Sequence, residues 1–232
     1  MREPAEIVED LERHAELPPG SEERFFGYSV MGCPFRSGHV LGLRRFPASS
    51  IGPDYRSVWH RDPRGRWTFY QDVPAELACT RYFGAQVDHV REGPIRIEWT
   101  GSRRFELSAG GGDLEWMMEV ESTPVTRVFN GVSSLLPARA WHSRPVLALM
   151  SRVAGVALRA GRVRMVGLTP NGQRFVGNPL TMWVGRTSRA TVAGTDLGEM
   201  GPAPEQAHLR DFFIPQRPVF AIGRAFFTEP AA

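Results

Sequence analysis

Side chains that could do acid-base chemistry gather most densely at Trp59-His60-Arg61-Asp62. Imidazole exchanges a proton near neutral pH, so His60 and His39, each on a predicted strand, are the candidate catalytic acid or base. Spacing alone pairs neither histidine with a carboxylate. The cluster fits the end of a hairpin equally well, with Asp62 capping the turn and the arginines in solvent.

Large rings form a second set of candidates. Rings that alternate along strands can line a pocket for a planar or long apolar ligand, while their polar atoms orient it. The same rings can simply fill a core. An arginine beside them can clamp a carboxylate or phosphate, because its planar group is always ionised. The candidate ligand-binding residues are Trp59, Trp67, Tyr70, Trp99, Trp116, Met118, Trp183 and Arg44.

Lysine is absent, since all 28 basic residues are arginine. Schiff-base chemistry, pyridoxal phosphate attachment and the lysine of a phosphate-binding loop are therefore excluded. The chain also has no dinucleotide glycine fingerprint, paired-histidine zinc helix or calcium loop, so we predict no cofactor and no metal. Cys33 and Cys79 have no metal-type spacing and are predicted to be buried free thiols.

Composition is that of an ordinary folded domain, with 232 residues, 42% hydrophobic and 23% charged. The formal charge of +3 could suggest nucleic acid, but the arginines are scattered among 25 acids and form no dense basic run, and we predict no nucleic-acid partner. The acidic start does not resemble a secretory signal, and no apolar run reaches about 18 residues. We therefore predict a cytoplasmic protein without stable membrane insertion, and leave a homodimer open.

Period-two alternation is clearest between residues 94 and 122. Apolar and charged side chains alternate in three stretches, 95–99, 104–108 and 114–121. Side chains on a strand point to opposite faces in turn, so this pattern predicts an antiparallel meander with one apolar face. Trp99, Trp116, Ile97, Phe105 and Met118 are expected to be buried on that face.

Turn residues predict two hairpins on either side of the meander. Asp62-Pro63-Arg64-Gly65 joins strands at 55–61 and 66–71, and Thr169-Pro170-Asn171-Gly172 joins strands at 162–168 and 173–177. Further strands are predicted at 39–46, 180–186, 190–194 and 219–227. The segments 27–38 and 47–53 are rich in turn residues and are predicted to be loops.

Two helices are predicted. The first lies in residues 1–20, where Ile7, Val8 and Leu11 share one stripe. The second spans 145–160 and is apolar on nearly every side, with Ser143 able to cap it and Gly161 to stop it. Such a helix is expected to be buried, either as a plug in one end of a barrel or as a lid over a ligand pocket.

A family resemblance follows from the strand residues. The tryptophan-bearing strands, the run Trp67-Thr68-Phe69-Tyr70 and the meander ending in Leu114-Glu115-Trp116 resemble the lipocalin-like (calycin) barrels of the carotenoid hydratase type. The resemblance covers about the middle half of the chain. It implies a β barrel that holds an apolar small molecule, sometimes with acid-catalysed hydration or cyclisation. Members usually carry two barrel-like halves, and this chain has no second copy.

We therefore predict a mostly β fold, with a single antiparallel lipocalin-like barrel at 21–232 and an N-terminal helix in 1–20. Three functions stay open. The barrel could bind an apolar or aromatic molecule such as a lipid, terpenoid or polyketide. It could be a cofactor-independent cyclase, hydratase or isomerase, or it could be a structural or protein-interaction module. A cavity with a titratable residue at its base would favour the enzyme.

Overall fold

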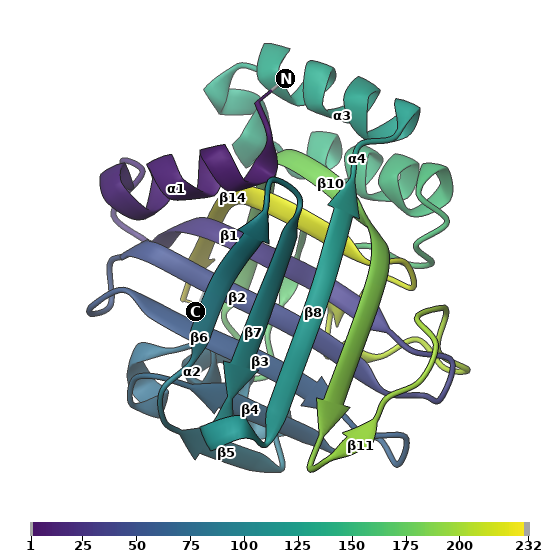
Figure 1. The fold of residues 1–232 in the computed structure, drawn as a ribbon. Coiled ribbons are helices and arrows are strands. Elements are labelled where there is room, and N and C mark those ends of the chain that lie inside the picture. Colours follow the sequence, from purple (N-terminus) through teal and green to yellow (C-terminus); the bar gives the residue numbers. More distant parts are fainter. Residues whose placement is uncertain (1, 230–232) are drawn as a thin grey trace.

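A computed structural model describes residues 2–229, apart from the side chain of Ala138. Most of the strands belong to one large sheet, and the three longest helices lie at one end of it (Figure 1). The strands are β1 (Glu23–Pro34), β2 (Val40–Ser49), β3 (Tyr55–Arg61), β4 (Trp67–Gln71), β5 (His89–Glu92), β6 (Arg96–Gly101), β7 (Arg104–Ala109), β8 (Leu114–Glu121), β9 (Val166–Leu168), β10 (Arg174–Val192), β11 (Thr195–Asp196), β12 (His208–Leu209), β13 (Phe212–Phe213) and β14 (Val219–Thr228). The α-helices are α1 (Pro4–His14), α2 (Thr80–Phe83), α3 (Pro124–Leu135) and α4 (Arg144–Ala157), and the short 3-10 helices are η1 (Ala75–Leu77), η2 (Gly84–Gln86), η3 (Gly110–Gly112) and η4 (Ala138–His142).

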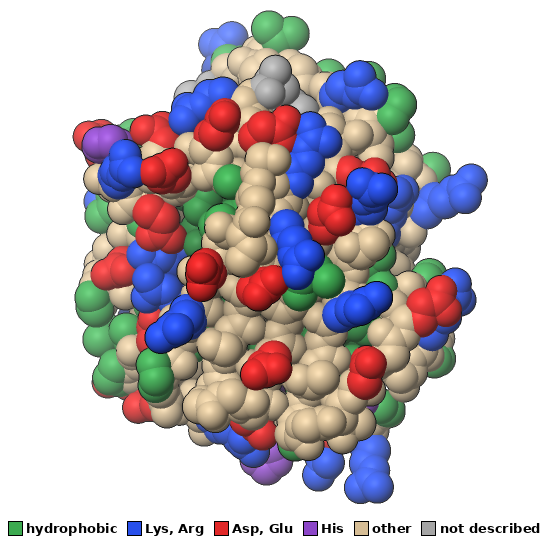
Figure 2. Space-filling model, viewed as in Figure 1, with side chains coloured by type: hydrophobic (Ala, Val, Ile, Leu, Met, Phe, Trp, Pro, Cys, Tyr) green, Lys and Arg blue, Asp and Glu red, His purple; other side chains and the backbone are tan. Residues whose placement is uncertain are grey.

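The predicted meander is confirmed as β6, β7 and β8. Phe105 pairs with Met118 and Leu107 with Trp116, so the apolar residues of neighbouring strands share one face. Phe105, Trp116 and Met118 are buried, while Ile97 and Trp99 are partly buried against them. Figure 2 shows acidic and basic side chains interspersed on the face that points outward. Period two in the sequence was therefore sufficient to assign the two faces.

Strand β10 joins the two halves of the sheet. Its first half, as far as Val184, pairs with β14, and its second half, from Val184 onward, pairs with β8. The sequence predicted this stretch as separate strands at 173–177, 180–186 and 190–194, with interruptions between them. Instead, register shifts beside Pro179 and Gly185 absorb the interruptions, as β-bulges do, and the strand continues.

The inner core lies between the two halves of the sheet. In Figure 1 strands β6, β7 and β8 lie in front of β1 to β4 and cross them. Burying large side chains from both halves provides most of the favourable free energy of such a packing. The inner core includes Tyr28, Val30, Leu41, Leu43, Val58, Tyr70, Phe105, Leu107, Leu114, Trp116, Met118, Val120, Trp183 and Phe220.

The sheet corrects the predicted barrel in two respects. Its strand order is β5-β4-β3-β2-β1-β14-β10-β8-β7-β6, which is an open path rather than a closed ring. The pairing of β4 with β5 is parallel, so the sheet is mixed. The mostly β class is confirmed, whereas a single closed antiparallel barrel is not what these strands form. The resemblance to calycin barrels stays a prediction.

Strand β1 lies at the centre of the sheet, between β2 and β14. The sequence predicted a loop at 27–38 because of its glycines. Gly27 instead allows close approach of two strands, since a Cβ there would lie 2.0 Å from the carbonyl oxygen of Arg45. The predicted loop at 47–53 also begins late, because β2 continues to Ser49. Both predicted hairpins, at 62–65 and 169–172, are confirmed.

The helices were predicted less completely than the hairpins. Helix α1 lies within the predicted 1–20, and α4 replaces the predicted 145–160, although the Ser143 side chain makes no capping hydrogen bond. The helix ends at Ala157, before the predicted stop at Gly161, and Arg159, with φ of 52°, takes the left-handed position that follows its end. Helix α3 was missed. Thr123 caps it in a capping box with Thr126, and Pro124 occupies its first turn. No helix in the described part of the chain is long and apolar enough to cross a membrane.

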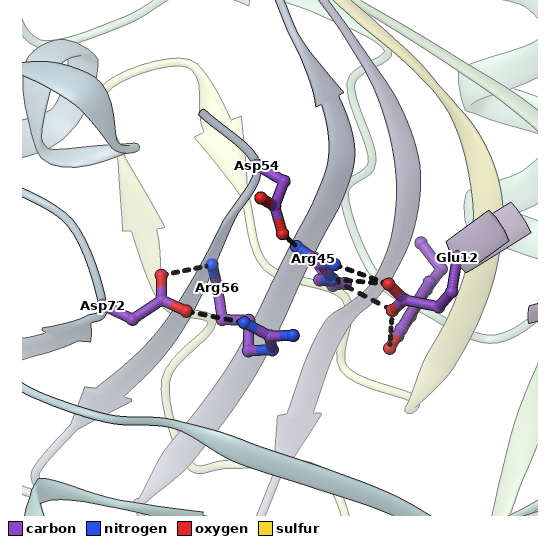
Figure 3. Close-up of polar contacts among 6 residues, drawn as sticks. Glu12, Arg45, Asp54, Arg56 and Asp72 are labelled. Atoms are coloured by element: carbon purple, nitrogen blue, oxygen red, sulfur yellow. Dashed lines mark hydrogen bonds and ion pairs between the residues drawn. The ribbon is translucent and has the colours of Figure 1, made fainter. Parts of the chain in front are cut away.

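Arg45 fastens α1 to the sheet. Its guanidinium donates hydrogen bonds to Glu12 on α1 and to Asp54, at 2.5 Å from a carboxylate oxygen of each (Figure 3). The hydroxyl of Tyr28 donates to the same Glu12 carboxylate at 3.0 Å. Arg45 is buried, and opposite charges are what a buried arginine requires. Figure 3 also shows Arg56 paired with Asp72 nearby.

The inner core gives a first prediction. Trp116 is buried, packs edge-to-face on Phe105, and donates from its indole nitrogen to Ser188 Oγ at 2.8 Å. Trp116→Ala should lower the free energy of unfolding by about 3 to 5 kcal/mol, measured by urea denaturation. Met117→Ala, on the other face of β8, is the control and should cost under about 1 kcal/mol. A loss of that small size for Trp116 would contradict this register.

Candidate functional site

An apolar cavity of about 140 Å³ lies on the face of the sheet that points away from the inner core. Strands β1, β2, β10 and β14 form its floor, and the end of α4 with residues 160–165 covers one side. Its wall includes rings from four separate segments, at Phe46, Trp59, Phe83 and Phe212. Such a concave apolar space with few polar groups is typical of a small-molecule site.

Arg44 is the buried cation of this cavity. Its Nη1 donates to the carbonyl oxygens of Val30, at 2.6 Å, and Leu43, at 2.7 Å, and its Nη2 lies 3.4 Å from that of Met31. The guanidinium lies over Trp59, 4.4 Å from the ring centroid, and 5.4 Å from Phe212. Among the described residues, no carboxylate pairs with Arg44, and no hydrogen bond forms from its Nε.

The charge of Arg44 persists despite its burial. Burial lowers the pKa of Arg44 to about 10, so the guanidinium is still protonated at neutral pH. A buried ion without a counter-charge costs several kcal/mol, of which carbonyl oxygens and an aromatic face recover a part. The cavity therefore has a positive potential that a bound anion would compensate.

Cys79 is a second polar group in the cavity wall. Its sulfur lies 3.3 Å from the hydroxyl of Tyr55, and both side chains are buried. Burial raises the pKa of Cys79 to about 11 and that of Tyr55 well above its usual value. Both groups are therefore neutral near pH 7, and Cys79 is not an activated nucleophile. The described residues that line the cavity include no histidine, aspartate or glutamate.

The predicted ligand-binding residues lie on both faces of the sheet, some on the side of the cavity and the others in the inner core. Arg44 and Trp59 lie together in the cavity wall. Trp67 packs edge-to-face on Trp59, behind the wall. The others belong to the inner core or pack against it, on the opposite side of the sheet: Tyr70, Trp99, Trp116, Met118 and Trp183. Whether any of these residues contacts a ligand stays a prediction.

The two candidate catalytic histidines lie next to each other but away from the cavity. His39 Nδ1 and His60 Nε2 are 2.9 Å apart, and the rings stack at 5.2 Å. Along β3, Trp59 points to the cavity face, so its neighbour His60 points to the opposite face. Neither histidine lines the cavity as far as the structure describes it. Their catalytic role stays a prediction, with no cavity contact to support it.

Helix α4 covers the cavity rather than filling it. Ala154 and Leu158 line the cavity, and so do Val163 and Met165 just beyond the helix. Of the two predicted roles for this helix, this placement favours the lid. The sequence analysis named no site residue at 160–165 or 212–215, although both segments contribute to the cavity wall.

Comparisons with known proteins show a distant likeness among solved structures. No known family matches the sequence, and neither does any curated protein. Among solved structures, the chain is similar to acetoacetate decarboxylase from Legionella pneumophila, with 11% identity over 94% of this chain and 88% of that chain. The TM-score is 0.41, and a likeness at this level says nothing about ligand or activity.

The histidine pair gives a prediction about acid stability. Burial and the neighbouring His39 lower the pKa of His60 to about 4, whereas an unfolded histidine titrates near 6.5. Between these values the unfolded chain binds more protons, so stability present above about pH 6.5 should be lost as the pH falls toward 4, by at most about 3 kcal/mol. Urea denaturation at several pH values should show that the free energy of unfolding falls less steeply with decreasing pH in His60→Gln than in the unaltered protein. The exposed His89→Gln is the control, and an unchanged slope in His60→Gln would contradict the assignment.

Proposed function

We propose that this protein binds a small apolar molecule with an anionic head group, such as an aromatic or short branched carboxylic acid. The observation that carries the proposal is the buried Arg44 guanidinium, which faces an apolar cavity without a carboxylate among the described residues. A ligand carboxylate would supply the missing counter-charge. Rings such as Trp59 and Phe212 would contact the apolar part of the ligand.

Cavity size narrows the ligand class. A cavity of roughly 150 Å³ in another protein holds benzene. The 140 Å³ here therefore favours one ring or a short branched chain. Longer lipids, terpenoids and polyketides, which the sequence suggested, would require α4 to move away from the sheet. A carboxylate on a single ring fits both the volume and the charge.

Binding is favoured over acid-base catalysis by the character of the cavity wall. A cyclase, hydratase or isomerase needs a group that exchanges a proton near the operating pH. Of the groups near the cavity, Tyr55 and Cys79 have raised pKa values, and Arg44 has a pKa of about 10. Schiff-base chemistry is excluded because the chain has no lysine.

Arg44 also has a structural role that a test must separate from binding. The register of β1 against β2 shifts between Val30 and Cys33, and Arg44 donates to carbonyl oxygens at that bulge. A purely structural arginine would affect folding alone. A ligand-binding arginine would also affect the discrimination between charged and neutral ligands.

The proposal predicts charge-dependent binding. Phenylacetate should raise the melting temperature and quench tryptophan fluorescence, while the uncharged phenylacetamide should bind about 10- to 100-fold more weakly, since a charged hydrogen bond contributes about 1.5 to 3 kcal/mol. In Arg44→Met the preference for phenylacetate should disappear, whatever the change in basal stability. Calorimetric titration measures both ligands against both proteins.

Arg224→Gln provides the matched control. Arg224 also lines the cavity but is exposed, so its loss should leave most of the preference intact. Equal affinity of the two ligands for the unaltered protein would defeat the proposal. So would a preference that depends on Arg224 and survives in Arg44→Met.

The pH dependence of binding is a separate prediction. The affinity for phenylacetate should be constant from about pH 6 to 9, because Arg44 stays protonated while the ligand stays ionised. It should fall as the pH rises through about 10, where the Arg44 guanidinium loses its proton. Titrations with phenylacetamide correct for any general loss of structure at high pH. If the affinities for phenylacetate and phenylacetamide fell in parallel, the charge of Arg44 would not be the source of the preference for phenylacetate.

A further inference from the structure

Helices α3 and α4 each expose a stripe of apolar side chains. Positions three or four apart share one face of a helix, so the exposed residues of each helix form a continuous line. Several are more than half exposed, with Leu135 at 84%, Val156 at 82% and Val128 at 68%. The stripes consist of Val125, Val128, Val132 and Leu135 on α3, and Leu149, Val153 and Val156 on α4.

Both stripes occur in the same part of the molecule. Figure 1 places α3 and α4 together at one end of the sheet, and Figure 2 shows green and blue side chains along that upper edge. Both helices contribute to one core cluster from their inner sides, with Phe129 of α3 packed against the cluster that includes Leu147 of α4. The two exposed stripes are together called the helix face below, and no other part of the described chain covers them. Exposed patches of this kind mark contacts with other surfaces.

The charged residues in the segment that contains both helices have a single sign. Residues 122–195 contain ten arginines and neither aspartate nor glutamate. The expectation of arginines scattered among the acids does not hold for this segment, because all the acids lie outside it. Among the described residues, no ion pair involves the five exposed arginines on or beside the helix face: Arg127, Arg139, Arg144, Arg152 and Arg159.

We propose that the helix face docks on an anionic lipid bilayer. Helices that lie in a membrane interface bury an apolar stripe among the lipid chains and keep basic side chains at the level of the head groups. Basic residues near an anionic leaflet each add to the attraction. The helix face has both features, and neither helix needs to cross the bilayer. This docking does not depend on what the cavity holds.

Lipid fits the helix face better than a protein partner does. A second copy would bring the unpaired arginines of two identical surfaces together, which is unfavourable without an acid between them. Protein interfaces also draw most of their energy from aromatic anchors, and the exposed stripes have only valine and leucine. A lipid bilayer is fluid, so its chains can pack around the valine and leucine side chains without preformed pockets.

Docking would bring the cavity close to the lipid. On α4, Ala154 and Leu158 line the cavity, while Val153 and Val156 lie on the exposed stripe. Less than one helix diameter, about 10 to 12 Å, separates the two sides. The cover of the cavity would thus be the element in contact with the membrane.

Vesicle flotation tests the proposal. The protein should float with vesicles of equal phosphatidylcholine and phosphatidylglycerol, and not with phosphatidylcholine alone. Added salt should weaken binding. Replacing three arginines in one variant, Arg127→Gln, Arg144→Gln and Arg152→Gln, should weaken binding by about 100-fold. Leu135→Ser with Val156→Ser should weaken binding at least tenfold, because both side chains are exposed and contribute little to the fold.

Matched controls come from the opposite parts of the surface. Arg96→Gln with Arg189→Gln removes exposed charge from the meander half of the sheet, and Val90→Ser removes an exposed apolar side chain from β5. Both should bind vesicles as the unaltered protein does. Equal flotation with neutral vesicles, or no flotation at all, would overturn the proposal. A lipid-free dimer in sedimentation velocity that dissociates in the Leu135→Ser, Val156→Ser variant would also overturn it, with a second copy as the occupant.

Discussion

The pleat of strand β2 separates two neighbouring arginines, and much of the structure depends on that separation. Arg45 points toward α1, where Glu12 and Asp54 neutralise it and hold the helix on the sheet. Arg44 points to the opposite face, where three carbonyl oxygens and the ring of Trp59 surround it. Both cations lose water on burial, but only one gains counter-charge. The same backbone alternation thus places an arginine with two carboxylate partners on one face of the sheet and, on the other, an arginine without a carboxylate partner among the described residues.

Irregularities of the sheet make the Arg44 environment available. At the bulge between Val30 and Cys33 the ladder between β1 and β2 is interrupted, which leaves carbonyl oxygens for a side chain to use. Further shifts in β10 let one long strand pair with β14 and then with β8, so that the sheet folds over its inner core. The outer face of β1, β2, β10 and β14 is then left to be covered by α4 and loops, and the cavity lies beneath that cover.

Local patterns in the sequence predicted local structure well. The meander and both hairpins follow from alternation and turn residues within a few positions of one another. Strand β1 was missed because glycines that permit close strand packing, such as Gly27, look like turn residues when no partner strand is known. The cavity was only half predictable: Arg44 and Trp59 were named as candidates, but nothing local in the sequence associates Met165 or Phe212 with them, because the fold brings these distant segments together. His60 and Trp59 were both named as site residues, although period two already places these neighbours on opposite faces of the strand.

Helix α4 shows why an all-round apolar pattern is ambiguous. The sequence predicted a buried helix, since water disfavours apolar surface on every side. In the structure, one side covers the cavity while Leu149, Val153 and Val156 remain exposed. A helix that had only to cover the cavity could carry polar residues on its outer side at no cost to packing. The proposed contact with an anionic bilayer would cover this apolar outer side, and the arginines around it, with no acid between 122 and 195, suit a surface of negative charge.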